Sequence, residues 1–440
     1  MLNEREEQRN GMTLDTVKTS SPSLDMYISK SFDDDKYLTA DLLYVFNNNN
    51  QHTLSQELID DNRPVYKDYM ELHSRKNTLV PEIDYSIEKE QFSLSLGYKA
   101  QLSWLSNIVN DGISNQRRSS IFAQTHNLYA EYSSEIGPVL YGVSLGGTFD
   151  IKKSDYNFSK FSFTPDILIR WNVNNKNSLR FNLSAYTTMP DVQQMSDNRI
   201  MILEGIYAAG NTRLESFATY LASLKYRYHK GRDLDVTLSG DISLSPQKSY
   251  HTFLEQTDGW IYTYANAFLF WEGGPSFAFT YYPHENLRLA FNGRALFQSF
   301  KETKESLVLK NWYFPANFQV RYSNKHFALS YYQMLGGLSL DGNIYLGLEK
   351  SSYINATYTF GDFTIGLRCF FPFIKDNYSN TTSTTSKVTN ESNYELKTKN
   401  HSLGIVFSWN FSKGKELDTI KDIENDVEDT GKFIYDRKKR

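Results

Sequence analysis

Apolar and polar side chains alternate through nearly the whole chain, and this alternation limits the fold more than any other feature. In residues 234–244, Leu234 and Val236 share one face, and Asp235 lies between them on the other. Residues 287–298 alternate in the same way. Because successive side chains of a β-strand point to opposite faces, the pattern predicts strands with one apolar and one polar face.

The expected strands are also long. Many run about 10 residues, against roughly five or six in soluble sheets, and about 10 tilted residues are needed to cross a bilayer. The seventeen expected strands are residues 24–32, 37–46, 79–87, 91–104, 125–134, 139–150, 160–171, 178–186, 217–228, 233–244, 261–282, 287–298, 312–322, 326–334, 350–360, 363–372 and 401–411. The strand over 261–282 is expected to be broken by a bulge or kink at Gly273 and Gly274.

Short and long connections alternate between these strands. Short turns are expected at residues 33–36, 88–90, 135–138, 172–177, 229–232, 283–286, 323–325 and 361–362. Long polar connections are expected at residues 47–78, 105–124, 151–159, 187–216, 245–259, 299–311, 335–349 and 373–400. Short periplasmic turns and long extracellular loops are typical of bacterial outer-membrane barrels. The sequence therefore predicts an all-β, antiparallel transmembrane β-barrel of about 16–18 strands.

The composition agrees with a barrel. The chain of 440 residues holds 31 Tyr and 29 Phe, yet its mean hydropathy is only −0.53. In a barrel every second residue faces lipid, so mean hydropathy stays low while aromatic residues collect at the membrane surfaces. The net charge of −4 does not favour a nucleic-acid partner. Outer-membrane lipid is the partner that the pattern implies.

The alternation assigns the two faces of each strand. The apolar set is expected to face lipid and the charged set the lumen, and one misassigned residue would invert its strand. The lipid-facing set is Phe181, Leu183, Leu238, Leu289, Ile365, Phe407 and Trp409. The lumen-facing set is Arg180, Asn182, Asp233, Asp235, Arg288, Arg294 and Arg368.

Residues that could support chemistry are sparse. The single cysteine, Cys369, excludes an internal disulfide and lies on the apolar face of its strand. The eight His residues are scattered without zinc-ligand spacing, and residues 33–35, three Asp, fit a solvated turn better than a calcium loop. No phosphate-binding loop or nucleophile motif is present. The sequence predicts no catalytic residue, metal or cofactor, so it does not favour an enzyme.

Two stretches resemble a known family. The segment 190–196 includes Pro190, Gln194, Met195 and Ser196, and it is followed by Gly210, Asn211 and Leu214. Together they resemble a loop of TonB-dependent outer-membrane receptors, namely the β-barrel family with an N-terminal carboxypeptidase-regulatory-like domain. Thr212 stands where that family usually has Pro, and Glu215–Ser216 replace Lys-Pro.

The last strand also resembles the end of that family. Phe407, Trp409 and Phe411 alternate with small or polar residues in the expected closing strand. A charged tail follows, so the terminal aromatic residue is not the last residue of the chain.

The resemblance implies a receptor that takes up a scarce ligand through the outer membrane. Such receptors bind their ligand in external loops, and an inner-membrane motor moves a plug aside. The ligand could be a small molecule, a glycan, a peptide or a siderophore-type compound, and its binding residues are not assigned. A TonB complex is a partner only if an N-terminal part with plug and TonB box exists.

The expected organisation has three parts: a disordered or loop remnant over 1–23, the barrel over 24–411, and a charged periplasmic tail over 412–440. The odd number of strands and the absence of a signal peptide or plug suggest a truncated receptor. The resemblance implies a 22-strand barrel, of which about five strands would be missing. Residues 24–32 and 401–411 should then not form a complete ladder. A passive porin or structural barrel is the alternative, and an outer-membrane enzyme is a weaker one.

Overall fold

The computed structural model describes residues 9–33, 35–59, 63–110, 117–196, 199–203, 206–257, 259–348, 350–373, 378–384, 389–395 and 402–411. Every regular element in these ranges is a β-strand. None of these residues forms a helix long and apolar enough to cross a membrane. The expected charged tail over 412–440 and residues 1–8 lie outside the described ranges.

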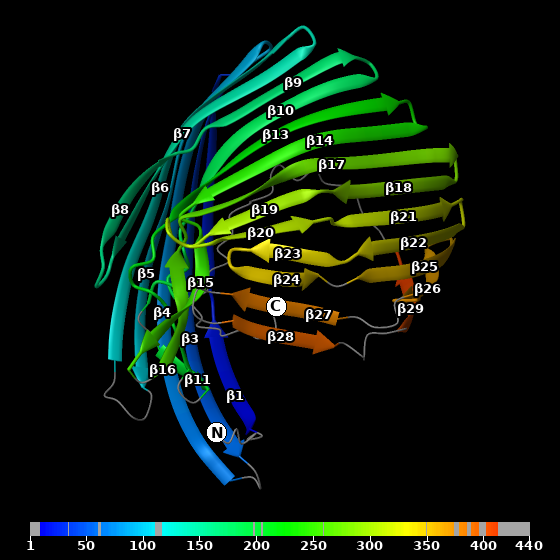
Figure 1. Cartoon of the computed structure of the whole chain (residues 1–440). Helices are drawn as coiled ribbons and strands as arrows, with labels where there is room; N and C mark the ends of the chain where they lie inside the picture. Colours follow the sequence, from blue (N-terminus) through cyan, green and yellow to red (C-terminus); the bar gives the residue numbers. More distant parts are fainter. Residues whose placement is uncertain are drawn as a thin grey trace.

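A curled antiparallel sheet of 21 strands forms the wall of the molecule (Figure 1). Its first ten strands are β1 (Arg9–Ser20), β2 (Ser23–Asp33), β3 (Lys36–Ile59), β4 (Arg63–Lys89), β5 (Phe92–Asn110), β6 (Arg117–Ile136), β7 (Val139–Lys153), β8 (Phe158–Phe163), β9 (Asp166–Asn174) and β10 (Asn177–Thr188). The others are β13 (Phe217–Lys230), β14 (Leu234–Pro246), β17 (Leu269–His284), β18 (Leu287–Arg294), β19 (Leu296–Lys301), β20 (Val308–Tyr313), β21 (Ala316–Ser323), β22 (Phe327–Leu335), β25 (Ser351–Phe360), β26 (Phe363–Phe370) and β29 (Leu403–Trp409). The wall strands pair antiparallel with strands that are adjacent or nearly adjacent in chain order, as β3 with β4 and β7 with both β8 and β9. This confirms the predicted antiparallel, all-β fold.

Two predicted strands are interrupted by proline. Residues 160–171 divide into β8 and β9 around Pro165, and residues 312–322 divide into β20 and β21 around Pro315. Proline has no N–H to donate, so it interrupts a ladder. Its carbonyl still accepts, because Ala185 N donates to Pro165 O over 2.9 Å. Both halves therefore stay in line with the wall.

The single strand predicted over 261–282 is wrong. Residues 259–266 form β16 (Gly259–Asn266), which pairs with β15 (Ser249–Gln256) in a separate sheet, and only β17 belongs to the wall. The predicted irregularity at Gly274 does lie opposite a break in the wall, between β18 and β19. A Cβ on Gly274 would lie 1.9 Å from the carbonyl oxygen of Ala295, so this close approach requires glycine.

The loop predicted over 47–78 instead extends two strands of the wall. Residues 47–59 of β3 pair with residues 63–78 of β4, for example Asn48 with Arg75, with one shift of register after Glu57. β1 pairs with the same part of β3, where we expected a loop remnant. These extensions carry polar residues on both faces, so they lack the alternation that identifies the strands below them.

The remaining strands form two small sheets from the long connections. Sheet B holds β11 (Arg199–Leu203), β12 (Ile206–Ala209), β16 and β15, and its β12–β16 pairing is parallel. Sheet C holds β23 (Gly337–Asp341), β24 (Ile344–Leu348), β27 (Tyr378–Thr384) and β28 (Thr389–Glu395). The described parts of these connections therefore form strands of their own.

The opposite end of the wall carries the predicted short turns. Gly137, Gly231 and Gly361 adopt φ values of 55°, 52° and 55° in three of them. This left-handed conformation is one that glycine adopts at no steric cost. The two ends of the wall therefore differ as the sequence predicted.

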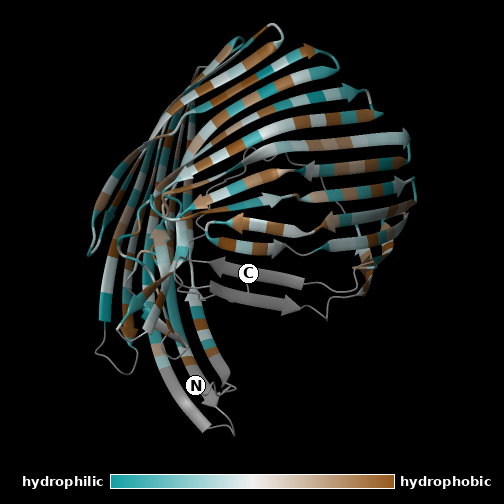
Figure 2. Cartoon of the chain, in the orientation of Figure 1, coloured by the Kyte–Doolittle hydropathy of each residue, from teal (hydrophilic) through white to brown (hydrophobic). Residues whose placement is uncertain are grey.

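The apolar face of the wall points outward. Leu238 and Ile365 are each 49% exposed, and Phe407 is 66% exposed. Figure 2 shows apolar and polar residues alternating along the strands. A protein in water does not expose so large an apolar surface, so this face is suited to lipid.

Among the described residues, the two edge strands of the wall, β2 and β29, each pair with one other strand. β2 pairs along its length with β3, and β29 pairs with β26. The expected absence of a complete ladder between β2 and β29 stays a prediction.

Candidate functional site

The two halves of the predicted loop motif meet in the connection between β10 and β13. Residues 191–196 form a compact turn, in which Met195 N donates to Asp191 O over 3.2 Å. The second half returns to this turn, where Asn211 N donates to Gln194 O over 2.7 Å. The structure thus brings the motif residues of both halves together: Pro190, Gln194, Met195, Ser196, Gly210, Asn211 and Leu214. Their functional role stays a prediction.

Gly210 allows the two halves to come this close. A Cβ at this position would lie 2.4 Å from the carbonyl oxygen of Ser196 and 2.6 Å from that of Gln193. Real side chains do not tolerate such distances to backbone atoms. The motif glycine is therefore explained by packing against the 191–196 turn.

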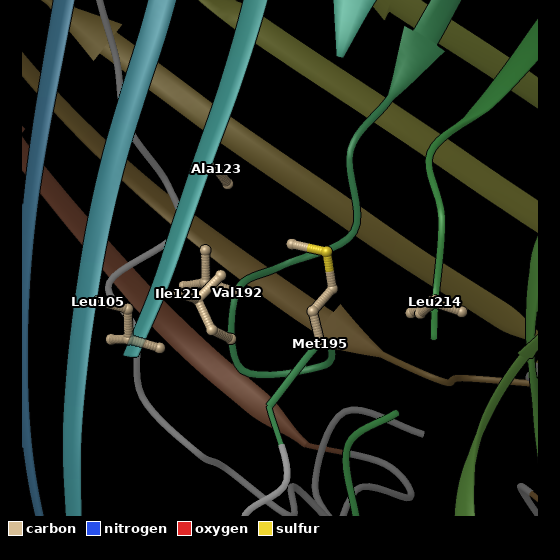
Figure 3. Close-up of a cluster of buried hydrophobic side chains, with 6 residues drawn as sticks. All are labelled: Leu105, Ile121, Ala123, Val192, Met195 and Leu214. Carbon is tan, nitrogen blue, oxygen red and sulfur yellow. The ribbon is translucent and has the colours of Figure 1, made fainter. Parts of the chain in front are cut away.

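The turn is anchored by apolar contacts to the inner face of the wall. Met195 and Leu214 are fully buried and share a cluster with Val192 (Figure 3). From the wall, Leu105 of β5 and Ile121 of β6 belong to the same cluster. The connection thus folds inward and lies on the concave side of the sheet.

Polar contacts join the same surfaces. Gln193 and Asn107 of β5 interact through their side-chain amides over 3.3 Å, and Gln193 Nε2 donates to Ser74 Oγ of β4 over 3.3 Å. Lys152 Nζ donates to the carbonyl oxygen of Thr212, and Lys160 Nζ donates to that of Ser216 over 2.6 Å.

These wall residues were not singled out from the sequence. Gln193 lies inside the motif segment, but Ser74, Asn107, Lys152 and Lys160 are separated from it in sequence. Lys152 shares the polar face of β7 with Asp150, and that is the only sequence signal for it.

Sheet B extends this inner layer over the first strands. Ala208 of β12 packs in one cluster with Met70 and Leu72 of β4 and Val109 of β5. Asn211 also reaches sheet B, because its Nδ2 donates to the carbonyl oxygen of Tyr264 over 2.7 Å. Motif and sheet B therefore form one continuous layer.

Sheet C is linked to sheet B by an apolar cluster and an ion pair. Tyr250 of β15, Phe300 of β19 and Leu340 of β23 are buried in one cluster. Lys248 Nζ lies 2.6 Å from Asp341 Oδ1 beside it. Tyr250 Oη donates to Glu302 over 2.8 Å; burial, together with this hydrogen bond, raises the pKa of the Tyr250 phenol well above its ordinary value.

The polar face of the wall forms hollows. Asn182, Asp241 and Arg294 line one of about 270 Å³, with Arg294 Nη2 3.3 Å from Asp241 Oδ2. Arg321 and Arg368 line another, of about 450 Å³.

Cross-strand contacts on this face agree with a polar lumen. Arg227 forms an ion pair with Asp235, and Arg288 Nη1 donates to Gln319 Oε1 over 2.7 Å. Arg180 Nε donates to Asn182 Oδ1 over 3.0 Å on the same strand face.

The predicted closing-strand residues lie on the outward face. Phe407, Trp409 and Phe411 are 66%, 59% and 72% exposed, and Trp409 stacks on Phe363 of the neighbouring strand at 5.8 Å between ring centroids. Cys369 is half-buried on the outward face of β26. Among the residues described, no three or more His, Cys, Asp or Glu side chains are grouped as a metal site.

Solved structures share this architecture. No family model matches the sequence, and no curated protein matches it. The siderophore receptor PirA from Pseudomonas aeruginosa is 13% identical with a TM-score of 0.51, over 83% of this chain and 77% of that one. The chain has the barrel fold of TonB-dependent outer-membrane receptors. The copper transporter OprC is 9% identical with a TM-score of 0.61, over 90% and 72% of the two chains.

A third neighbour gives the same result. BauA, the ferric preacinetobactin receptor from Acinetobacter baumannii, is 11% identical with a TM-score of 0.56, over 90% of this chain and 64% of that one. At these identities the likeness concerns the fold. This fold, with its apolar face turned outward, is that of an outer-membrane protein.

Proposed function

We propose that this chain is the barrel part of a receptor for TonB-dependent uptake of a scarce ligand. The observation that carries the proposal is the ordered inner layer, in which the 187–216 connection and sheet B pack on the concave face of the wall. A passive pore gains from a wide lumen, whereas a receptor needs fixed surfaces at its external end to hold a ligand.

The ligand that we propose is a small metal complex of the siderophore type. The neighbours named above include a siderophore receptor, a copper transporter and a ferric preacinetobactin receptor. The polar hollows with Arg294 and Arg368 supply donors for the anionic oxygens of such complexes. Uptake of a glycan or a peptide in place of the metal complex would be a different outcome of the uptake test described below.

We further propose that the plug and the export signal of the receptor lie outside this sequence, which would make the chain a truncated receptor. The barrel interior would then contact a plug domain, and TonB would act on that domain. The domain limits that we propose are a barrel that includes β1 and extends to residue 411, followed by a periplasmic tail over 412–440.

Uptake tests this function directly. A bacterium without its own receptor for a ferric siderophore would express either this chain or this chain fused behind a plug domain and signal peptide. We expect uptake of labelled ferric complex from the fusion, abolished when TonB is deleted, and none from the chain alone.

A conductance measurement distinguishes a receptor from the alternative function, a passive porin. The fusion, reconstituted in a planar bilayer, should be closed at rest because the plug fills it. A steady conductance that is independent of ligand and plug, with no uptake in the cell assay, would overturn the receptor function and favour a passive pore.

A further inference from the structure

A row of side chains crosses four neighbouring strands on the exposed face of the wall. Asn77 pairs with Trp104, Trp104 with Phe122, and Phe122 with Lys153, from β4 to β7. Partners in an antiparallel ladder project from the same face, so the four side chains form one line. Trp104 and Phe122 are stacked within this line, with 4.9 Å between ring centroids.

The line lies on the lipid side of the wall. The chain neighbours of its members belong to the other face and are buried: Lys76, Leu105, Ile121 and Lys152. Below the line, towards the short turns, the same face is apolar and exposed, as at Leu128, Leu145 and Phe161. Above it, towards the loops, the face becomes polar, with Arg75, Ser106 and Arg118. This change from apolar through aromatic to basic marks the membrane surface at the loop end of a barrel.

A groove of about 1170 Å³ lies at this level, where β6 and β7 stop pairing. Its lining includes the aromatic pair Trp104 and Phe122 and, on the exposed face, Arg75, Arg118 and Lys153. Asp155 is the acidic residue among the lining side chains that the structure describes. Within the described residues, neither the two arginines nor Lys153 has an ion-pair partner. The groove therefore carries uncompensated positive charge.

The spacing of the cations suits a ligand with more than one anionic group. Adjacent strands lie about 4.8 Å apart and residues two apart lie about 7 Å apart, so the three Cα positions are roughly 10–16 Å from one another. Arg binds phosphate through parallel N–H donors, and Lys binds it as a compact charge. The aromatic pair lies beside apolar wall, which a free anion would not contact.

We propose that this groove binds the phosphorylated sugar headgroup of a glycolipid in the outer leaflet. The phosphates would contact Arg75, Arg118 and Lys153, and the acyl chains would lie against the apolar strand face below Trp104 and Phe122. The three cations and the aromatic pair are on the outward face of the wall, whereas Leu105, Ile121 and Lys152, which also line the groove, are on the inner face. The proposed lipid contacts are therefore with residues that do not belong to the inner layer.

The test uses the full chain in phosphatidylcholine nanodiscs with a small fraction of bis-phosphorylated lipid A, and it measures the bound lipid A by native mass spectrometry. The variant Arg75→Gln/Arg118→Gln/Lys153→Gln should bind lipid A on the order of 100-fold more weakly, at roughly fivefold for each cation near a membrane surface. All three residues are exposed, and heat-resistant migration on a gel verifies that each variant is folded.

A matched control removes three exposed cations at the short-turn end, as Lys230→Gln/Arg232→Gln/Lys325→Gln, and should retain lipid A as the native chain does. Dephosphorylated lipid A should bind the native chain as weakly as the groove variant binds the phosphorylated lipid. Equal retention by the groove variant and the native chain would overturn the proposal. So would displacement of lipid A by millimolar inorganic phosphate, which would identify a site for the free anion.

Discussion

At the scale of single residues, Gly210 decides whether the two halves of the inner connection can meet. In Gly210→Ala the new Cβ would need to displace the carbonyl oxygens of Ser196 and Gln193, which belong to a closed turn. We expect the 187–216 segment to become sensitive to protease in the folded barrel. The control is Gly240→Ala, because nothing lies within 4 Å of a Cβ there. Equal protease resistance of the two variants would show that the close approach is not needed.

Tyr250 gives a pH-dependent contribution to stability. Its pKa is raised in the folded protein, so its protonated form is favoured by folding. Its contribution is therefore fully present below the ordinary tyrosine pKa of about 10 and is lost as the pH rises beyond it. Melting temperatures in detergent should differ between the native chain and Tyr250→Phe at pH 8, and the difference should narrow at pH 11. A difference that does not change with pH would contradict this assignment.

At the scale of elements, the membrane-spanning strands were predictable because one physical constraint acts on all of them. Leu234, Val236 and Leu238 must face lipid while Asp235 must not, so apolar and polar residues alternate in the sequence. The extensions of β3 and β4 were not predicted because their buried inner face carries polar residues such as Asn47 and Asn49, so the apolar–polar alternation is lost. β16 was misassigned because it is packed on both faces, as the consecutive buried residues Ile261, Tyr262 and Thr263 show, and its apolar residues were taken to face lipid.

The candidate site was predictable only in part. Met195, Gly210 and Leu214 could be named from a local resemblance, whereas their contacts with Leu105 and Lys152 could not. Such contacts depend on how a long connection folds back on a distant strand, and no local pattern encodes that path.

The inner connection should be held mainly by its buried apolar residues. Met195→Ala and Leu214→Ala each remove a fully buried side chain, which costs about 2–5 kcal/mol in well-packed sites. We expect faster hydrogen exchange across residues 187–216 with little change in the wall strands. Met26→Ala serves as the control, because Met26 is 49% exposed on the outward face of β2. Unchanged exchange in both inner variants would mean that the polar contacts of Gln193 and Lys160 suffice.

At the scale of the whole molecule, the inner layer links strands that are far apart along the wall. Sheet B joins connections from β10–β13 and β14–β17 and packs on β4 and β5, and sheet C contacts it near Leu340. A ligand bound to this layer would thus be coupled to many strands of the wall at once. That arrangement fits a receptor better than an open pore.

Closure of the barrel is also a property of the whole molecule. Unpaired backbone groups cannot face hydrocarbon, so a wall in a membrane must be completed by its own edges or by further strands. The proposed truncation predicts that β2 and β29 do not form a regular ladder. Cysteines that face each other in adjacent antiparallel strands can form a disulfide, which makes the ladder measurable.

In a Cys369→Ser background, Ser29→Cys would be combined with Gly404→Cys, Val406→Cys or Ser408→Cys, all on the inner face. The positive control is Ser29→Cys with Thr39→Cys, because these two residues are partners in the β2–β3 ladder. We expect oxidation to link the control pair and none of the three test pairs in the purified chain. An efficient intramolecular link between β2 and β29 would contradict the truncated receptor and favour a self-sufficient, porin-like barrel. It would leave the outward groove unaffected, because its strands β4–β8 are paired in either case.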